Sequence, residues 1–194
     1  MKYTRVIQDP QCCVPACIKM ILLRYKLRQL SQEKIGYELG LTVSPEDKDI
    51  FNKVRVATSP DDLIGTQLHK KEYSLNDFFE KYSYPLKYEY HYIDEPNLIK
   101  GFLDENKDYD IIVCFEIKGI YTKGINKPNV IPSGGHVALI ENFENNQLTL
   151  VDGWFDSCKI VSIEEIAKAI KVHGQKNAAG FWLIKKNEEI NNDN

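Results

Sequence analysis

The sequence predicts an α+β domain, with helices in its N-terminal half packed on a mostly antiparallel sheet formed by its C-terminal half. Helix start and stop signals dominate up to about residue 82, and strand signals dominate after residue 86. The 194 residues are 43% hydrophobic and 11% aromatic, which is enough for one substantial core. Because no internal repeat or low-complexity linker interrupts the chain, we expect a single domain over residues 1–186 and a frayed polar tail over 187–194.

Three helices are expected in the first half of the chain. The first begins near Val14, because the proline that follows suits the first turn of a helix, and runs to about Leu27. The second follows Ser31, which is a suitable N-cap, and stops at Gly40. The third follows Ser74 and extends through residue 82.

Residues 42–73, between the second and third helices, show little periodicity and contain Pro45, Pro60 and Gly65. A connection of this length is either functional or contains short elements that periodicity does not detect. Two interpretations stay open: a flap over a binding cleft, or a surface excursion with a short helix over about 45–54.

The second half of the chain contains most of the expected strands. Residues 86–93 alternate with period two, and residues 109–117 form a continuous apolar run that is typical of a central strand. The expected turn Glu144-Asn145-Asn146 joins two further strands into a hairpin. The remaining expected elements are strands at 136–143, 147–151, 159–161 and 179–185, helices at 96–105 and 162–172, and a turn-rich loop at 119–134.

The charge pattern excludes several classes of partner. The formal net charge is −3, and the 25 basic and 28 acidic side chains are mixed along the chain, so no basic face for nucleic acid is expected. No apolar run, residues 20–23 included, is long enough to span a membrane, and the N-terminus lacks the apolar segment of a secretory signal. The five cysteines suggest no disulfide framework, so we expect a cytoplasmic protein with reduced thiols.

Cys13 is the candidate nucleophile. It lies at the start of the first expected helix, where unsatisfied N–H groups and the helix dipole favour a thiolate. A cysteine in such a position is suited to nucleophilic catalysis if a base lies within reach.

Among the four histidines, His136 is the candidate base. It follows two glycines and is the first residue of an apolar strand, so its side chain is expected to be held rigidly at the end of that strand. His69 lies in the irregular stretch, His91 in a strand among tyrosines, and His173 just past a helix end. Any of these three can be an ordinary surface or partly buried histidine.

Asp152 ends the second strand of the predicted hairpin, sixteen residues after His136. If the hairpin folds near Asn145, its two open ends lie on neighbouring strands about 5 Å apart. Asp152 can then reach the imidazole ring and fix its tautomer. The alternative is that Asp152, followed by a glycine, simply begins a turn.

The chain contains, in this order, a glutamine, a cysteine before a Pro-Ala helix start, a Gly-His strand and an Asp one hairpin later. This ordered set resembles the motifs of the double-glycine leader peptidases. These are bacterial papain-like cysteine peptidases, fused to bacteriocin exporters or standing alone. The resemblance implies a papain-like fold and a peptide or protein substrate. It also implies that Cys13 is the nucleophile, His136 the general base and then acid, Asp152 its orienting partner, and Gln8 the side-chain donor to the oxyanion.

Two departures from the family pattern leave alternatives open. Val14 replaces the usual glycine, and the gap between Gln8 and Cys13 is one residue shorter than the family pattern. Gln11 is therefore a second candidate for the oxyanion hole, and Cys12 a second candidate for the nucleophile. The same fold could also serve a thiol amidase or acyltransferase, or a catalytically silent module that binds peptides.

The remaining candidate groups have simpler interpretations. Cys17 and Cys114 are expected in the core, and Cys158 is expected to be partly exposed. A zinc site built from Cys12, Cys13, Cys17 and His136 lacks a CxxC pair, so we expect no metal and no other cofactor. Trp154 and Phe155 either line a substrate pocket or pack at a strand end.

Overall fold

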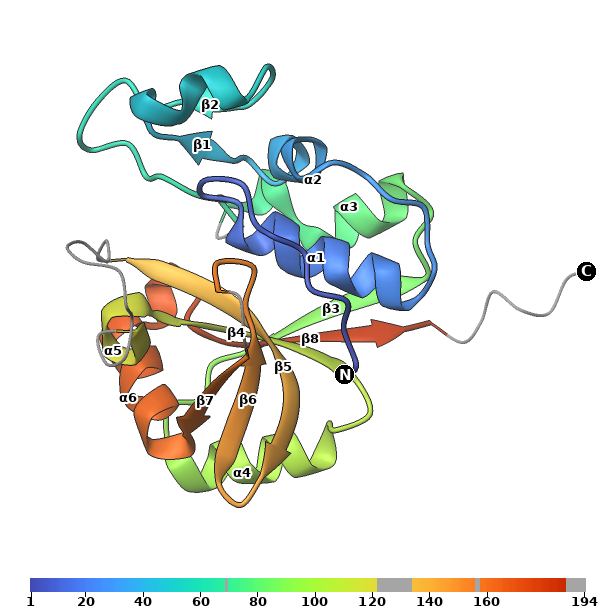
Figure 1. The fold of residues 1–194 in the computed structure, drawn as a ribbon, viewed down its shortest axis with the longest axis vertical. Helices are drawn as coiled ribbons and strands as arrows, with labels where there is room; N and C mark the ends of the chain where they lie inside the picture. The colour runs from blue at the N-terminus through green and yellow to red at the C-terminus, as the bar shows by residue number, and fades with distance from the viewer. Residues whose placement is uncertain (69, 122–133, 156–157, 188–194) are drawn as a thin grey trace, which may run out of the picture. The chain divides into compact units, whose positions relative to one another are not determined.

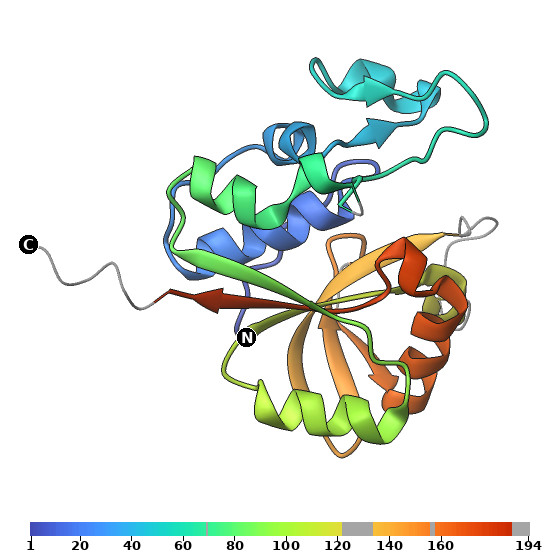
Figure 2. The same cartoon turned by 180° about the vertical axis from the view of Figure 1, so that it is seen from behind.

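A computed structural model of the chain describes residues 1–68, 70–121, 134–155 and 158–187. It divides into two compact units, drawn from both sides in Figures 1 and 2. Unit 1 comprises Met1–Tyr88, Gly153–Asp156 and Lys185–Asn194, and unit 2 comprises Glu89–Asp152 and Ser157–Ile184. The chain therefore passes between the units four times, and no single linker separates them. Helices and an antiparallel sheet are both present, as the sequence predicts.

The helices of unit 1 are α1 (Cys13–Arg24), α2 (Gln32–Glu38) and α3 (Leu75–Lys81). Ser31 and Ser74 act as predicted, since their side chains accept hydrogen bonds from main-chain N–H groups in the first turns of α2 and α3. The prediction that the first helix reaches Leu27 was wrong. Lys26 adopts a left-handed conformation with φ +54°, which ends the helix just after Arg24.

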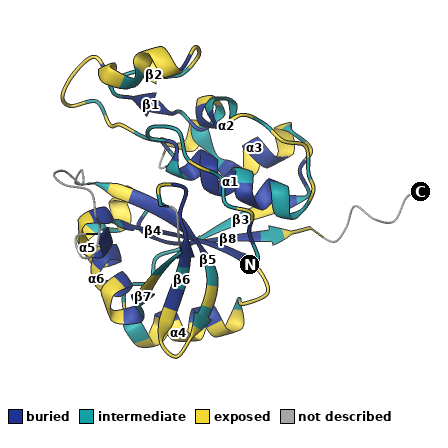
Figure 3. Ribbon diagram, viewed as in Figure 1, coloured by how far each residue is buried: buried dark blue, intermediate teal, exposed yellow. Residues whose placement is uncertain are grey.

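Helix α1 is buried along most of its length, as the dark blue of Figure 3 shows. It contacts α2 within unit 1. This burial accounts for the apolar sequence of α1 and fixes the position of its first residue, Cys13.

The irregular stretch after α2 contains short elements: strands β1 (Thr42–Val43) and β2 (Arg55–Val56), and 3₁₀ helices η1 (Pro45–Ile50) and η2 (Lys71–Tyr73). Strands β1 and β2 pair in parallel, and the short helix that one interpretation expected lies at η1. Cys12, Leu41, Val43 and Phe51 form a small buried cluster, with Val54 and Val56 packed against it. The segment thus has its own apolar core.

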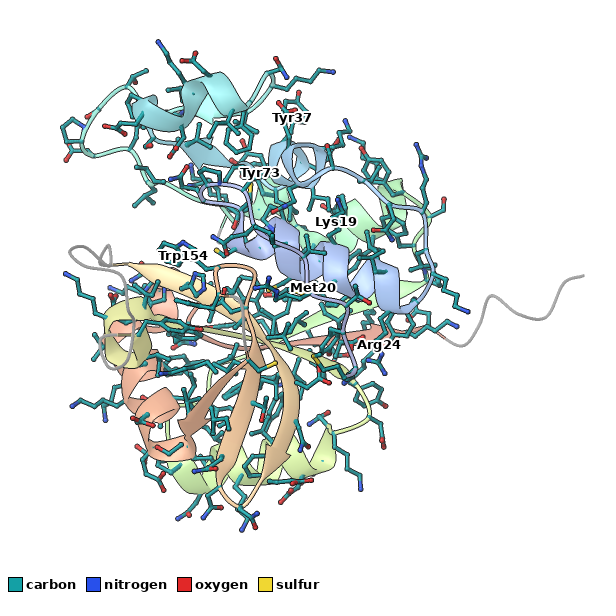
Figure 4. All side chains as sticks on the ribbon, viewed as in Figure 1. Lys19, Met20, Arg24, Tyr37, Tyr73 and Trp154 are labelled. Carbon is teal, nitrogen blue, oxygen red and sulfur yellow. The ribbon has the colours of Figure 1, made fainter. Side chains whose placement is uncertain are left out.

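Gly40 joins this segment to α2. Its φ of +69° is in the left-handed region, and a Cβ there would meet the ring of Tyr73, whose side chain is labelled in Figure 4. Glu33 adds a second tie, because its side chain accepts from the N–H groups of Asn52 and Lys53.

The main sheet has the strand order β3-β8-β4-β5-β6-β7. Every pair from β8 to β7 is antiparallel. The chain's last strand therefore lies between β3 and β4. The strands are β3 (Leu86–His91), β4 (Asp110–Glu116), β5 (Gly135–Glu144), β6 (Gln147–Val151), β7 (Lys159–Ser162) and β8 (Gly180–Lys186).

Strands β5 and β6 form the predicted hairpin. Glu144 pairs with Gln147, and the two residues between them, Asn145 and Asn146, have φ of 51° and 61°. Two successive residues with positive φ are typical of a type I′ turn, which asparagine tolerates well. The turn therefore sets the register of the pairs next to it, and an irregularity between Ile140 and Asn142 shifts the register by one residue farther along the hairpin.

The described part of unit 2 contains the α-helices α4 (Pro96–Glu105), α5 (Ile117–Tyr121) and α6 (Ile163–His173), and the 3₁₀ helix η3 (Gln175–Asn177). Helix α6 begins with a capping box between Ser162 and Glu165, and it contacts β4, α5 and α4. The prediction of a loop from residue 119 was wrong at its start, because Gly119 and Tyr121 belong to α5. The rest of that predicted loop, 122–133, lies outside the described residues.

The C-terminal strand β8 ends near residue 187. The N–H of Asn187 donates to the carbonyl of Pro85 at 2.9 Å within unit 1, and the rest of the predicted tail, 188–194, lies outside the described residues. Among the residues that the structure describes, no helix has the length and apolar character needed to cross a membrane.

Candidate active site

His136 and Asp152 form a buried pair in unit 2. The His136 Nε2 lies 2.6 Å from the Asp152 Oδ2, and the two residues are only 4% and 1% exposed. In the hairpin, Leu139 pairs with Val151. The next pair in the same register places Asp152 opposite Ala138. His136 lies two residues from Ala138 and on the same face of the strand. The contact is therefore a diagonal cross-strand pair.

Tyr121 is a third member of this group. Its hydroxyl donates to the Asp152 Oδ2 at 2.6 Å, so the same carboxylate oxygen contacts both Tyr121 and His136. Tyr121 is 1% exposed. A carboxylate buried this deeply needs hydrogen-bond donors to remain charged, and the structure supplies two short ones.

Two aromatic rings pack edge-to-face with the His136 imidazole. The ring of Phe115, its partner in the β4–β5 register, lies 5.8 Å away at 80°, and the ring of Tyr121 lies 5.9 Å away at 82°. Edge-to-face packing of this kind is favourable and restricts rotation of the ring. With Nε2 directed at Asp152, Nδ1 is the nitrogen on the other side of the imidazole.

A second histidine–carboxylate pair lies beside the residues that precede His136. The Glu116 side chain accepts from the Gly134 N–H at 2.9 Å and lies 3.9 Å from the His173 Nδ1. The His173 ring packs so closely against Gly135 that a Cβ there would overlap it. Burial lowers the pKa of His173, and the nearby Glu116 carboxylate partly opposes that effect. Glycine at position 135 is thus required for packing.

Cys13 is the first residue of α1 in unit 1 and is half-buried. The first turn of α1 contains no acidic residue, and the N-cap residue Cys12 makes no side-chain capping bond. The positive end of the helix is therefore not neutralised by a neighbouring side chain of its own first turn. A thiolate at this position would be stabilised by that end.

Cys12 has a different environment from its neighbour. It is fully buried in the cluster with Leu41, Val43 and Phe51. Burial raises the pKa of the Cys12 thiol well above its ordinary value, and the nearby Asp9 raises it further. Both effects argue against Cys12 as the nucleophile.

The two candidate glutamines also differ. The Gln11 Nε2 donates to the Asp47 Oδ2 at 2.8 Å, which engages the amide of that side chain with a carboxylate. The Oε1 atoms of both glutamines are buried and have no hydrogen-bond partner among the described residues, so the difference lies in the engaged amide of Gln11. Gln11 is therefore the less suitable oxyanion donor of the two.

The main chain around Gln8 is held by groups distant in sequence. The buried Gln32 side chain donates to the Ile7 carbonyl at 2.8 Å and accepts from the Asp9 N–H at 3.1 Å. The Gln8 N–H donates to the Gly153 carbonyl at 3.0 Å within the same unit. A Cβ on Gly153 would come 2.7 Å from the carbonyl oxygen of Val6, so only glycine permits this approach.

The other candidate groups lie elsewhere. His91 is partly exposed and 3.9 Å from Glu89, and His69 lies outside the described residues. The Trp154 side chain, labelled in Figure 4, is 46% exposed and lies 6.0 Å from the ring of Phe155. All five cysteines are free, with Cys17 and Cys114 buried and Cys158 half-buried. No cluster of three or more metal-ligating side chains occurs among the described residues.

The structure thus brings His136 and Asp152 together and adds Tyr121, which the sequence interpretation missed. Cys13 and Gln8 belong to unit 1. A signal for Tyr121 was present, because Ile117, Ile120 and Tyr121 follow the i, i+3, i+4 spacing of a helix face, and all three are buried.

A comparison with solved structures gave a match over nearly the whole chain. The match is a Bacillus anthracis protein described as a "putative C39-like peptidase", with a TM-score of 0.54 and 14% sequence identity. The alignment covers 94% of this chain and 94% of the other. The chain thus has a fold similar to that protein's, and the predicted fold class is confirmed. No protein-family model and no curated protein matched the sequence.

Proposed function

We propose that this chain is a cysteine peptidase-like thiol hydrolase that cleaves a peptide or other amide bond. The observation that carries the proposal is the buried pair of His136 and Asp152, joined at 2.6 Å. It occurs on a fold similar to that of a C39-like peptidase. In this proposal the folded protein brings the sulfur of Cys13 to the imidazole of His136, which gives a Cys-His-Asp triad.

In the first half-reaction, the Cys13 thiolate attacks the carbonyl carbon of the scissile amide. The carbonyl oxygen takes up the negative charge, and the Gln8 side-chain amide and the Cys13 main-chain N–H donate to it. The imidazolium of His136 then gives a proton to the leaving nitrogen. The C–N bond breaks, the amine departs and a thioester to Cys13 remains.

In the second half-reaction, water releases the acyl group. Neutral His136 takes a proton from the water as its oxygen attacks the thioester carbon. The C–S bond breaks, the carboxylic acid departs and the thiolate–imidazolium pair is restored. Through both steps Asp152 holds the imidazole and balances its positive charge, as its position at Nε2 suggests.

The contacts in unit 1 support the roles of Cys13 and Gln8. Cys13 has the helix-start position that favours a thiolate, whereas Cys12 is buried and the Gln11 amide is engaged by Asp47. Asp152 and Gly153 are consecutive in the chain, and the Gly153 carbonyl accepts from the Gln8 N–H. Because Gly153 is bonded to Asp152 and hydrogen-bonded to Gln8, these contacts support assigning Gln8 to the same site as Asp152.

We further propose that the chain is a stand-alone relative of the double-glycine leader peptidases, acting on a peptide or protein in the cytoplasm. The motif residues and the fold support this assignment. The leader peptidases fused to exporters cut after Gly-Gly, but no part of this chain resembles an exporter. The proposal therefore does not include that cleavage preference.

Selective alkylation tests the nucleophile and its base. Cys158 is a matched control, because both it and Cys13 are free and half-buried. We expect iodoacetamide at pH 6 to label Cys13 at least about tenfold faster than Cys158, measured by peptide mass spectrometry. His136→Ala should reduce the Cys13 rate to that of Cys158, whereas His91→Ala should leave it unchanged.

Two outcomes would contradict the proposal. If Cys13 in the wild-type protein reacts no faster than Cys158, the chain lacks an activated thiol and a catalytically silent peptide-binding module becomes the better assignment. If His136→Ala leaves a fast Cys13 unchanged, His136 is not its base. Where the thiol is active, a peptide library screened against the wild type and Cys13→Ser identifies the bond that is cut.

A further inference from the structure

Tyr121 lies in one buried group with His136 and Asp152, but it has no role in the proposed reaction. Its hydroxyl lies 2.6 Å from the Asp152 Oδ2, and that oxygen is also 2.6 Å from the His136 Nε2. All three side chains lie in unit 2 and are nearly inaccessible to solvent.

Other tyrosine hydroxyls in the described residues donate to carbonyls or to carboxylates. The Tyr90 hydroxyl donates to the main-chain carbonyl of Ala179 at 2.7 Å, and the Tyr84 hydroxyl donates to that of Arg28 at 2.8 Å. The half-buried Tyr82 and Tyr92 donate to the carboxylates of Glu38 and Asp94. The contact of Tyr121 is distinguished by its burial and by its acceptor, because the same carboxylate oxygen also contacts the imidazole of the proposed base.

We propose that Tyr121 is a positioning residue for His136, acting through Asp152: it holds the carboxylate against Nε2 and lowers the pH at which the imidazole takes up a proton. The inference rests on the proposed function for its role in catalysis. The contacts through which Tyr121 acts on His136 lie inside unit 2.

The direction of the effect follows from electrostatics. A carboxylate beside an imidazole stabilises the imidazolium cation, so it raises the pH at which the ring titrates. A hydroxyl donating to the same oxygen withdraws part of the negative charge that the imidazolium would feel. A base that must be neutral in one half of the reaction and protonated in the other benefits from this balance.

Other charged groups also face this end of β5. Glu116 of β4 and His173 of α6 lie beside Gly134 and Gly135, just before His136. Burial lowers the pKa of His173, so His173 takes up a proton at a lower pH than an ordinary histidine does. The measurement must therefore follow each imidazole separately.

The test is NMR titration of the imidazole rings in the full-length protein, with His136 assigned by the loss of its signals in His136→Gln. Tyr121→Phe removes only the hydroxyl, and Tyr90→Phe is the matched control in the same unit. We expect Tyr121→Phe to raise the titration midpoint of His136 by about 0.5 to 1 pH unit, since a hydrogen bond to a charged group is lost. Tyr90→Phe should leave the midpoint unchanged.

A second variant keeps the test decisive if Tyr121→Phe does not fold. Incorporating 3-fluorotyrosine at position 121 preserves the hydroxyl and makes it a stronger donor, so the midpoint of His136 should fall. A midpoint that is the same in wild type, Tyr121→Phe and the fluorotyrosine protein would overturn the inference, as would shifts of the same sign in both variants. Failure of the proposed function is separate, because it appears as slow alkylation of wild-type Cys13, whereas the inference is judged by the difference in His136 midpoint between the wild type and the Tyr121 variants.

Discussion

The hairpin of β5 and β6 and the opening segment before α1 both carry proposed catalytic groups, but they are built in different ways. In the hairpin, a two-residue turn at Asn145 and Asn146 and a one-residue register shift between Ile140 and Asn142 together set the register that brings Asp152 to His136. The opening segment has no regular structure of its own and is held by groups far away in the sequence. The comparison teaches that the proposed base is fixed by local pairing, whereas the proposed nucleophile and oxyanion donor depend on remote contacts.

The two regions also differ in how they bury their polar groups. The hairpin buries the Asp152 carboxylate, which has short hydrogen-bond contacts with His136 of β5 and Tyr121 of α5. Beside the opening segment, Cys12 is buried among apolar side chains while its neighbour Cys13 stays partly accessible. One region pairs a buried carboxylate with hydrogen-bonding groups, and the other places a buried thiol next to a partly accessible one.

The largest effect on this comparison should come from Gly153→Ala. The new Cβ would lie 2.7 Å from the Val6 carbonyl and 3.0 Å from the Gln8 main-chain nitrogen, so the opening segment must move. We expect a loss of about 2 to 3 kcal/mol in the free energy of unfolding, measured by urea denaturation.

Gly101→Ala is the matched control for this substitution. Gly101 lies in α4 and a Cβ there meets nothing within 4 Å, so alanine should stabilise the protein by about 0.5 to 1 kcal/mol. Equal stability of Gly153→Ala and the wild type would show that the Gln8–Gly153 contact does not hold the opening segment.

A smaller effect should separate the two adjacent cysteines. Cys12→Ser places a hydroxyl in the apolar cluster with Leu41, Val43 and Phe51, and we expect it to cost about 1 to 2 kcal/mol of stability. Cys13→Ser, at the partly accessible helix start, should change the free energy of unfolding by less than about 0.5 kcal/mol. If the two variants unfold at the same urea concentration, the contrast between the two positions is wrong.

The smallest expected effect is a loss of stability at low pH, caused by Glu38 of α2. This helix holds the opening segment through Gln32. Partial burial tends to raise the pKa of Glu38, but hydrogen bonds from Lys81, Lys34 and Tyr82 outweigh it and lower that pKa from 4.5 to about 2. Because the folded-state pKa is depressed, the stabilisation is complete above about pH 4.5 and is lost as the pH falls towards 2.

Glu38→Gln should therefore destabilise the protein by about 1 kcal/mol at pH 7, since the lysines are largely exposed and screened. The difference from wild type should shrink as the pH is lowered towards 2, as measured by urea denaturation over that range. A difference that stays constant with pH would exclude an electrostatic contribution from Glu38.

Much of the local structure could be predicted because its signals lie close together in the sequence. Residues 96–105 and 147–151 match α4 and β6, and the serine before α6 acts as a cap. The sequence also predicted the contact between His136 and Asp152, but not the bulge between Ile140 and Asn142 on which it depends. The register of the turn alone would put the two side chains on opposite faces of the hairpin.

The rest could not be predicted because it depends on distant partners. Strands β1 and β2 have two residues each, and their pairing relies on the cluster around Cys12. The burial of Cys12 likewise comes from residues about thirty to forty positions away. Tyr121 was missed because its helix has only five residues, too few for periodicity to stand out within an expected loop.

The strand order has a consequence for how the protein is made. Strand β8 follows all the other strands of the sheet in the chain but lies between β3 and β4, so the sheet cannot be completed until β8 has been synthesised. At about 5 to 20 residues per second, roughly 8 to 35 seconds separate the synthesis of Cys13 from that of β8. A nascent chain should therefore carry its thiol for that time before the sheet that bears the proposed base is complete.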